Sequence, residues 1–593
     1  MPRPFNNFQF RDFAGLNTGV PAEATPGQAS VLKNLYKQKE ALQRRKGSAR
    51  LGNLTPAQAH DGLAWYKIGS TAYLIAAHNG SLVDWLAATP GTTLTGGSGV
   101  LTSGVDANAA WLDAVVYWGD GVLQNKRHNG TNVAQVLTDA PLTAPTVAVG
   151  AATGPTGTFN YYTTFLSADS HHSAVGSKSA GVTVTDQKIN LTAIPTCPAG
   201  QGCIGRALWR NKDGTPDYFL VTTINDNTTT TYTDGMLDAA LVDPLTDILG
   251  VNLQNVRFPP CRLLITHQSR LVGAFCTTSE GDKHTIYLSN YREPWYCPIL
   301  PDLEEPTQGS RFPLQGIGAG EVTGLASHGS QVFVFTADAA WTLTATEQLQ
   351  DYTLHRFSNH GCVAHRTVQS VKDMIIWAST DGIYAVREGQ PAMRISDDVK
   401  ETYQAISAAD LAKAHAVTWD DKYFFIWPSG CLVYDLRFNL WTENTAWTWR
   451  VAVVTATGAA VERLYGAEAS AAAVRQLETG TTDEGAAITA TWASSDLDLG
   501  APHVEKRLYR VTAYFKTATG TATVRLYRDA GTTAAQTATH DLATVDQAGA
   551  TVSVLRLDCA EQLRAERFRL EVEYNGSATN FELLGLAVEF RVV

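Results

Sequence analysis

Short apolar strands separated by tight turns recur along most of the chain, and the pattern is clearest between residues 321 and 384. There VTGLAS, VFVFT and WTLTA follow one another, and after a gap VQSV, IIWAS and IYAV repeat the arrangement. Strands that alternate apolar and polar positions and are joined by turns predict antiparallel meanders. A meander that recurs is typical of a β-propeller, whose sheets bury their faces against one another.

Comparable meanders lie on both sides of this stretch. Residues 62–86 and 109–130 each contain one, and more follow between 261 and 468. Together they predict an all-β protein whose main body is a β-propeller of about seven blades. The tryptophans that we expect to fill the space between blades lie on second or third strands of these meanders, and they are Trp341, Trp377 and Trp427.

Residues 141–243 interrupt the meanders. They contain about seven short strands separated by Gly- and Pro-rich turns, with Tyr161 and Tyr162 on one strand, which is typical of an immunoglobulin or fibronectin-like β-sandwich. Because meanders resume after it, we expect this sandwich to be an insertion that divides the propeller into residues 51–140 and 244–480.

The two ends of the chain differ from the middle. Residues 481–593 contain strands in which apolar and charged side chains alternate, as in FRLEVE from residue 568, and this predicts a C-terminal β-sandwich with one face in water. Residues 1–50 are punctuated by Pro and Gly, so we expect an extended N-terminal arm. The arm ends in a basic cluster that is either solvated or docks on a partner, formed by Arg44, Arg45 and Lys46.

The composition indicates a globular protein of several domains. The 593 residues are too many for one ordinary core, 44% of them are hydrophobic and 17% are charged. The formal net charge of -11 argues against a protein that grips the phosphates of nucleic acid.

The number of cysteines and the length of the apolar runs indicate in which compartment the protein is made. The 8 Cys residues are too sparse for a disulfide-stapled secreted module. The opening residues, MPRPFNNFQF, contain no basic segment followed by an apolar run, and no apolar run is long enough to span a bilayer. We therefore expect a protein made in a reducing cytosol and without a membrane span.

Two sets of phrases in the sequence resemble tail proteins of tailed bacteriophages. Near the N-terminus, FAGLNTG, TPGQAS, KNL and LQRRKGS match the opening of those proteins, which contains GLNT, PGQA and an arginine pair shortly before a glycine. Between 357 and 399, FSNHGCVAH, WASTDGIY and ISDDV match a second phrase built on GC-x-A, W-x-S-x-x-G-I-Y and I-S. The DLG near residue 499 and the K-R pair after it resemble the terminal sandwich of the same proteins.

The resemblance implies a structural virion protein, similar to the tail nozzle or head-completion (tail stabilisation) proteins of short-tailed phages. Members of that family form a sixfold ring below the portal and adaptor, so the resemblance implies a homo-oligomeric ring, a hexamer, in the phage tail. Its partners would be the portal or adaptor and the tail fibre or tailspike proteins. Genomic DNA would pass through the ring during ejection, without sequence-specific binding.

Further expectations follow from the same resemblance. The protein would be assembled in the host cytoplasm and act in the virion, and neither enzymatic activity nor a cofactor or metal is expected. The cluster Arg44, Arg45 and Lys46 would face a protein partner or a subunit boundary.

The sequence contains few motifs of known enzyme or metal chemistry. No phosphate-binding loop, HExxH zinc pair or GxSxG nucleophile elbow occurs in the sequence, which disfavours enzymes built on those chemistries. His355, His360, Cys362 and His365 have the ligand types of a zinc site, but their spacing is not that of a zinc finger, and we expect them to be loop residues.

The predicted insertion contains two cysteines and two histidines that could serve as disulfide or ligand residues. Cys197 and Cys203, in CPAGQGC, could close a small disulfide loop in the finished particle, although two free thiols are expected in a reducing compartment. His171 and His172 fall in a polar loop, where we expect surface side chains.

Acidic turn residues support an alternative function. Asp338, Asp381, Asp420 and Asp421 are expected at equivalent turns of successive meanders, and paired carboxylates could serve glycoside hydrolysis. Tight turns themselves select Asp, however. The alternative is therefore a carbohydrate-binding or glycoside-hydrolysing propeller at a cell surface.

Overall fold

The computed structural model of the chain divides into two compact units. Unit 1 contains Met1–Trp65 and His360–Val593, and unit 2 contains Tyr66–Asn359. The residues that the structure describes are 5–10, 12–18, 28–54, 58–245, 257–298, 309–316, 318–345, 352–456, 462–468, 473–516, 518–545, 551–560, 563–577 and 581–593.

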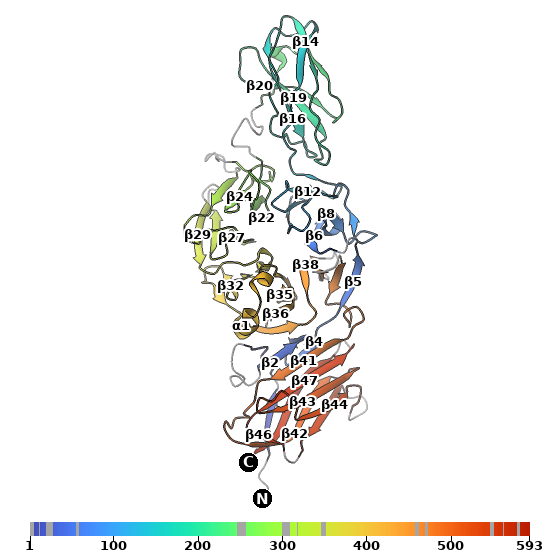
Figure 1. Ribbon diagram of the computed structural model, residues 1–593, viewed down its shortest axis with the longest axis vertical. Helices are drawn as coiled ribbons and strands as arrows, with labels where there is room; N and C mark the ends of the chain where they lie inside the picture. Colours follow the sequence, from blue (N-terminus) through green and yellow to red (C-terminus); the bar gives the residue numbers. More distant parts are fainter. Residues whose placement is uncertain are drawn as a thin grey trace. The chain divides into compact units, whose positions relative to one another are not determined.

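Four antiparallel sheets of four strands each make up most of the described part of unit 2 (Figure 1). Consecutive strands pair, so each sheet is a meander, and turns with two successive left-handed residues join several pairs, as at Asn79-Gly80 and Gln268-Ser269. The first two sheets are β6 (His60–Ile68), β7 (Thr71–His78), β8 (Ser81–Asp84) and β9 (Thr92–Thr93), and β10 (Asn108–Leu112), β11 (Val115–Gly119), β12 (Lys126–His128) and β13 (Val133–Gln135). The other two are β22 (Leu263–His267), β23 (Arg270–Ala274), β24 (Thr285–Leu288) and β25 (Ser310–Pro313), and β26 (Gly324–His328), β27 (Gln331–Phe335), β28 (Ala340–Ala345) and β29 (Tyr352–Ser358).

The insertion in unit 2 is a sandwich with its own core, in which Phe159, Tyr161, Ile189 and Leu208 are buried. Its strands occur within the range predicted for it. One face consists of β14 (Thr146–Ala152), β18 (Gln187–Thr192) and β21 (Tyr232–Asp234), and the other of β16 (Tyr161–Leu166), β19 (Gly205–Asn211) and β20 (Tyr218–Ile224). A further pair is β15 (Gly157–Phe159) with β17 (Val182–Val184), and the 3-10 helix η1 (Asp238–Ala240) follows.

Unit 1 contains three more meanders. They are β30 (Gln369–Val371), β31 (Met374–Ala378), β32 (Ile383–Arg387) and β33 (Met393–Arg394); β34 (His415–Trp419), β35 (Lys422–Trp427), β36 (Gly430–Asp435) and β37 (Leu440–Asn444); and β38 (Trp449–Ala456), β39 (Glu462–Glu468) and β40 (Ala473–Leu477) with β5 (Ser48–Asn53). Short helices lie beside them: η2 (His365–Thr367), η3 (Asp397–Val399), α1 (Lys400–Gln404) and α2 (Ala408–Leu411).

The C-terminal sandwich completes unit 1. One sheet contains β1 (Asn6–Phe10), β3 (Leu35–Gln38), β4 (Ala41–Arg44), β42 (Lys506–Lys516), β45 (Val552–Asp558), β46 (Arg564–Ala565) and β48 (Glu582–Val592). The second sheet contains β2 (Ala29–Lys33), β41 (Ile488–Ser494), β47 (Phe568–Gly576), β43 (Thr521–Arg528) and β44 (Gln536–Asp541). The expected alternation holds in β47, where Phe568, Leu570 and Val572 are buried and the residues between them are partly exposed.

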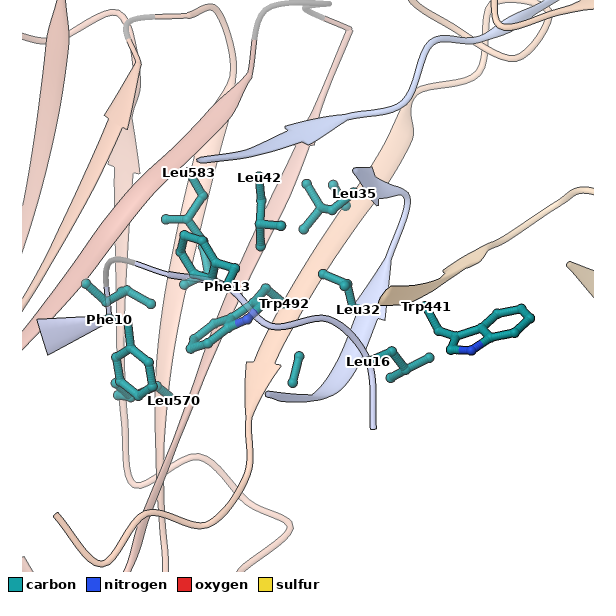
Figure 2. Packing of buried hydrophobic residues seen from close by; sticks show 14 of the residues in the cluster. Phe10, Phe13, Leu16, Leu32, Leu35, Leu42, Trp441, Trp492, Leu570 and Leu583 are labelled. Atoms are coloured by element: carbon teal, nitrogen blue, oxygen red, sulfur yellow. The ribbon is translucent and has the colours of Figure 1, made fainter. Parts of the chain in front are cut away.

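The second sheet does not stop at the sandwich. Strand β2 pairs with β41 on one side and in parallel with β37 on the other, so nine strands form one sheet, from blade strand β34 to sandwich strand β44. The hydrophobic core is continuous as well. Phe10 and Phe13 pack edge-on against Trp492, and the same cluster reaches Trp441 in the blade (Figure 2).

The structure confirms the predicted fold class, an all-β, β-propeller-type protein with an inserted and a C-terminal sandwich. The number of blades that close one propeller stays a prediction. The expectation of an N-terminal arm is wrong for residues 28–53, because β2 to β5 are strands of the blade and sandwich sheets. No helix among the described residues is long and apolar enough to cross a membrane.

Candidate functional site

Asn34 is the centre of a polar cluster between a blade and the C-terminal sandwich in unit 1. It follows β2 with a left-handed φ of 57 degrees, a conformation that Asn tolerates better than most residues, and its side chain is buried. Its Oδ1 accepts hydrogen bonds from Arg45 Nε (2.8 Å) and the Thr445 backbone N–H (3.0 Å). Its Nδ2 donates to Thr445 Oγ1 (2.5 Å) and the Thr489 carbonyl (2.7 Å). The amide therefore uses both its donors and both acceptor positions.

Arg45 is equally well satisfied. Its guanidinium is 1% exposed and forms a two-point ion pair with Asp483, at 2.6 and 3.2 Å. The remaining N–H groups donate to Asn34, to the Lys46 carbonyl (2.9 Å) and to the Thr445 carbonyl (3.1 Å). All five donors of the side chain are thus used, and hydrogen bonding to Asp483 helps to raise the pKa of Arg45 against the opposing effect of burial.

Arg44 holds the sandwich side of the same cluster. Its side chain is 2% exposed and donates to the carbonyls of Gly576 (2.8 Å) and Thr481 (3.0 Å). The guanidinium lies over the ring of Tyr574 at 5.6 Å. Burial lowers the pKa of Arg44, because backbone carbonyls compensate a buried charge less well than a carboxylate.

The basic cluster expected at the surface is therefore divided. Arg44 and Arg45 are buried and bonded within the chain, and only Lys46 is exposed. The prediction that Arg44 and Arg45 are solvated is therefore wrong. In this structure neither guanidinium is accessible to a partner, and Lys46 is the residue of the three that remains for such a role.

Glu478 extends the cluster toward blade strand β37. Its Oε1 accepts from the Tyr36 hydroxyl (2.8 Å), and its Oε2 accepts from the backbone N–H of Lys46 (3.1 Å). The Tyr36 hydroxyl in turn accepts from Asn444 Nδ2 (2.7 Å). Burial raises the pKa of Glu478, and Arg45 opposes that shift.

We call Asn34, Arg44, Arg45, Glu478 and Asp483 the junction. It joins three segments that are distant in the sequence: the N-terminal strands, the end of β37, and the connection from β40 to β41. Its N-terminal members, Asn34, Arg44 and Arg45, lie in the KNL and LQRRKGS phrases. No pattern in the sequence predicted that Glu478 or Asp483 would be their partners.

The second resemblance phrase also folds into buried contacts in unit 1. Trp377 Nε1 donates to the Gly361 carbonyl at 3.1 Å, and the hydroxyl of Ser396 accepts from the Ile383 N–H at 2.9 Å. Cys362 is buried with its thiol near the Ala364 carbonyl, and burial raises its pKa to about 12. These residues hold one blade together, and Trp341 and Trp427 are buried like Trp377.

The candidate metal set is not assembled. His360 stacks on Tyr384 with ring centroids 4.1 Å apart, while Cys362 is buried, His355 lies on β29 and His365 begins η2. In the part of the chain that the structure describes, no three His, Cys, Asp or Glu side chains are grouped so that they could hold a metal ion.

The acidic turn residues have different environments. Asp381 lies between the second and third strands of its sheet and accepts from the Tyr384 hydroxyl at 2.7 Å. Asp420 and Asp421 lie between the first and second strands of the next sheet, both with left-handed φ, and pair with Lys422 (2.5 Å) and Lys372 (2.8 Å). Asp338 is exposed between β27 and β28. The prediction that these residues lie at equivalent turns is therefore wrong for Asp420 and Asp421, whose turn joins a different pair of strands from that of Asp381.

The insertion is attached to the blades of unit 2 by side chains as well as by the backbone. Asp169 pairs with the buried Arg127 of β12 at 2.6 Å. His171 stacks on Trp295 at 3.6 Å, and burial lowers its pKa. His172 lies 3.0 Å from Thr164 Oγ1 and is also mostly covered. The two histidines expected at the surface are thus packing residues.

Comparisons with known proteins identify no family. No family model matches the chain, and no curated protein matches it. Among solved structures, the computationally designed Ika8 protein aligns over 72% of this chain and 99% of its own, with 11% identity and a TM-score of 0.32. BBS1N in complex with ARL6DN aligns over 58% and 100%, with 8% identity and a TM-score of 0.23. The Bombyx mori GH32 beta-fructofuranosidase BmSUC1 aligns over 57% and 93%, with 11% identity and a TM-score of 0.20. Similarities this low carry no argument about function.

Proposed function

We propose that this chain is a structural protein of a tailed-phage virion, a subunit of the nozzle ring through which DNA leaves the tail. The observation that carries the proposal is the junction. Asn34 and the arginine pair belong to the phrases that resemble phage tail proteins, and all three are buried hydrogen-bonding residues between blade and sandwich.

A nozzle wall needs domain connections that resist bending. Domains in one chain usually move relative to each other unless their interface is large and hydrophobic. Unit 1 has such an interface, because a single sheet of nine strands and a single hydrophobic cluster pass from the blade into the sandwich. The junction adds the ion pair of the buried Arg45 with Asp483 and a fully hydrogen-bonded Asn34, which connect the two parts.

The charge of the chain is compatible with a channel for DNA. A net charge of -11 disfavours strong contacts with phosphates, and each Lys or Arg that gripped the backbone would add a salt-dependent point of retention. In a closed ring, every subunit would use one patch against a different patch on its neighbour. The proposed partners remain the portal or adaptor and the tail fibres or tailspikes, with the virion as the place of action.

Electron microscopy of the purified protein, together with its mass in solution, tests this proposal. The expected result is a closed ring of identical subunits, a hexamer, and recovery of the same chain from purified phage particles by mass spectrometry. A protein that stays monomeric at high concentration, is absent from particles and binds or cleaves oligosaccharides would contradict the proposal and favour the carbohydrate-active alternative.

A further inference from the structure

Three arginines form one row across the C-terminal sandwich sheet that contains β42, β46 and β48. Arg507 of β42 is paired with Arg591 of β48 on one side and with Arg564 of β46 on the other. Residues paired in this way share one face of the sheet, with Cβ atoms about 5 Å apart. The next pair along β42 and β48, Leu508 and Phe590, is buried in the core. Because side chains alternate between the faces of a sheet, the three arginines, which we call the arginine row, lie on its outer face.

The arginine row lacks the carboxylates that usually accompany such charges. Like charges directly opposite each other in a sheet are destabilising. Elsewhere on this face the usual arrangement holds, since Arg510 pairs with Asp558 on the neighbouring strand at 2.6 Å. In the row, Arg564 has a carboxylate oxygen of Glu505 at 3.7 Å. Within the described part of the chain, Arg507 and Arg591 form no ion pair, and their buried Nε atoms have no hydrogen-bond partner.

Aromatic rings hold two of these guanidinium groups in position. Arg591 lies over the rings of Phe5 and Tyr509, at 4.3 and 5.4 Å, and Arg507 lies over the ring of Tyr509 at 4.8 Å. The two rings contact each other edge to face with centroids 4.7 Å apart, and Phe5 is 51% exposed. Stacking of this kind covers the plane of a guanidinium and leaves the N–H groups at its edge able to donate. Such an edge matches the two oxygens of a carboxylate.

We propose that the arginine row, together with Phe5 and Tyr509, is a docking site for an acidic segment of a partner protein. The charges are complementary, because the row presents adjacent cations and carboxylates on the partner would supply the missing anions. Arginine and aromatic side chains are also the residues that dominate binding at protein interfaces. A long polyanion such as DNA fits less well, since the row is short and the chain as a whole has a net charge of -11. The inference goes beyond the proposed nozzle function and does not depend on it.

Fluorescence anisotropy of a labelled hexaglutamate peptide, titrated with the full-length protein, tests the site. We expect the peptide to bind, with an affinity that falls as salt is added, and a hexaglutamine peptide not to bind. Arg591→Gln should weaken binding of hexaglutamate about tenfold, because a two-point contact between a guanidinium and a carboxylate is lost.

Arg556→Gln is the matched control. Arg556 is exposed on β45 and lies on the same outer face, opposite Thr512 of β42. The substitution removes the same charge from outside the row, so we expect the affinity to change by no more than about twofold. Equal losses in Arg591→Gln and Arg556→Gln would overturn the proposal, because they would show a general attraction between the face and any anion.

Arg591→Lys separates the contribution of the stacked guanidinium from that of charge alone. Lysine keeps the positive charge but lacks the planar edge, so hexaglutamate should bind with an affinity between those of the wild type and Arg591→Gln. Wild-type affinity in Arg591→Lys would contradict the proposed geometry, and absence of binding to the wild type would overturn the site. Binding of duplex DNA that is tighter than that of hexaglutamate and is lost in Arg591→Gln would assign the row to phosphates and overturn the assignment to a protein partner.

Discussion

At the scale of single residues, the junction shows how a strongly polar group can be buried in an acidic chain. Arg45 is 1% exposed, and its ion pair with Asp483 is accompanied by hydrogen bonds that use every remaining donor. A buried charge is tolerated only when it is paired in this way, so the loss of either partner is costly.

We therefore expect Arg45→Met to destabilise the protein by about 2 to 4 kcal/mol in urea unfolding monitored on unit 1. The cost lies below that of a completely buried pair, because Asp483 keeps 21% of its side chain exposed and can be partly solvated.

Lys46→Ala is the matched control, since Lys46 is the adjacent, exposed residue of the same cluster. It should change stability by no more than about 0.5 kcal/mol. Equal effects of the two substitutions would show that the junction does not contribute as described.

His128 provides a residue-scale prediction about pH. Burial, with a contribution from Arg127, lowers its pKa to about 4, and its Nδ1 lies 3.0 Å from the Tyr66 hydroxyl. In the unfolded chain the pKa of His128 is about 6.5. The contribution of the neutral His128 ring to the stability of the folded protein is therefore complete above about pH 6.5 and is lost as the pH falls toward 4. The loss amounts to roughly 3 kcal/mol.

His128→Gln keeps an acceptor for Tyr66 and removes the titration. We expect the melting temperature of the wild type to fall more than that of the variant between pH 7 and pH 4. Because other acidic and histidine groups titrate in both proteins, the difference between the two curves is the quantity to measure. Parallel curves would contradict a buried, neutral His128.

How far single residues could be predicted depends on how far away their partners are in the sequence. The burial of Trp341, Trp377 and Trp427 was predictable, because it follows from local strand patterns. The burial of Arg45 was not, since Asp483 is separated from it by 438 positions and a run of two arginines and a lysine is usually solvated.

At the scale of elements, the insertion is bound to unit 2 by more than its two connections. The ends of the insertion are held near each other by the ion pair of Asp139 with Arg257, at 2.6 Å. The insertion also supplies Asp169, the partner of Arg127, whose side chain is 2% exposed. Removing the sandwich therefore removes the counter-charge of a buried arginine.

Replacement of residues 141–256 by a short Gly/Ser linker should leave the blade sheets folded, because the ends to be joined are already close. The variant should be less stable than the parent protein, by about 2 to 4 kcal/mol, because Arg127 is left unpaired. Arg127→Met in the deletion background should recover most of the loss, measured as the melting temperature. Global unfolding of the doubly altered protein would contradict the independence of the insertion.

The elements themselves were largely predictable because meanders and sandwich strands are built from local contacts. The role of the first 53 residues was not. The residue pattern of β2 does not indicate that it pairs with β37 and β41, and the pattern of β5 does not indicate that it pairs with β40. Such pairings are decided by which sheet edge remains open after the rest has folded, and a pattern of single positions does not contain that information.

At the scale of the whole molecule, the net charge leads to a prediction about DNA. The net charge of the protein is -11, and Arg44 and Arg45 are buried in the junction, where they cannot contact phosphates. We therefore expect weak binding to duplex DNA in a gel-shift titration. Lys46→Ala should not alter that result. Tight binding that falls steeply as salt is added would contradict the proposed channel wall, because it would reveal repeated phosphate contacts.

The pairing of β1 with β48 has a consequence for biosynthesis. Asn6 pairs with Phe590, so the first strand that the structure describes finds its partner only when the last strand has been made. Unit 2, whose residues are contiguous, can fold while the ribosome is still translating, whereas β2 and β5 must wait for β41 and β40. A product truncated near its C-terminus lacks β48 and leaves strands of unit 1 unpaired. A chain without β48 therefore cannot complete the sheet that joins the N-terminal strands of unit 1 to its C-terminal strands.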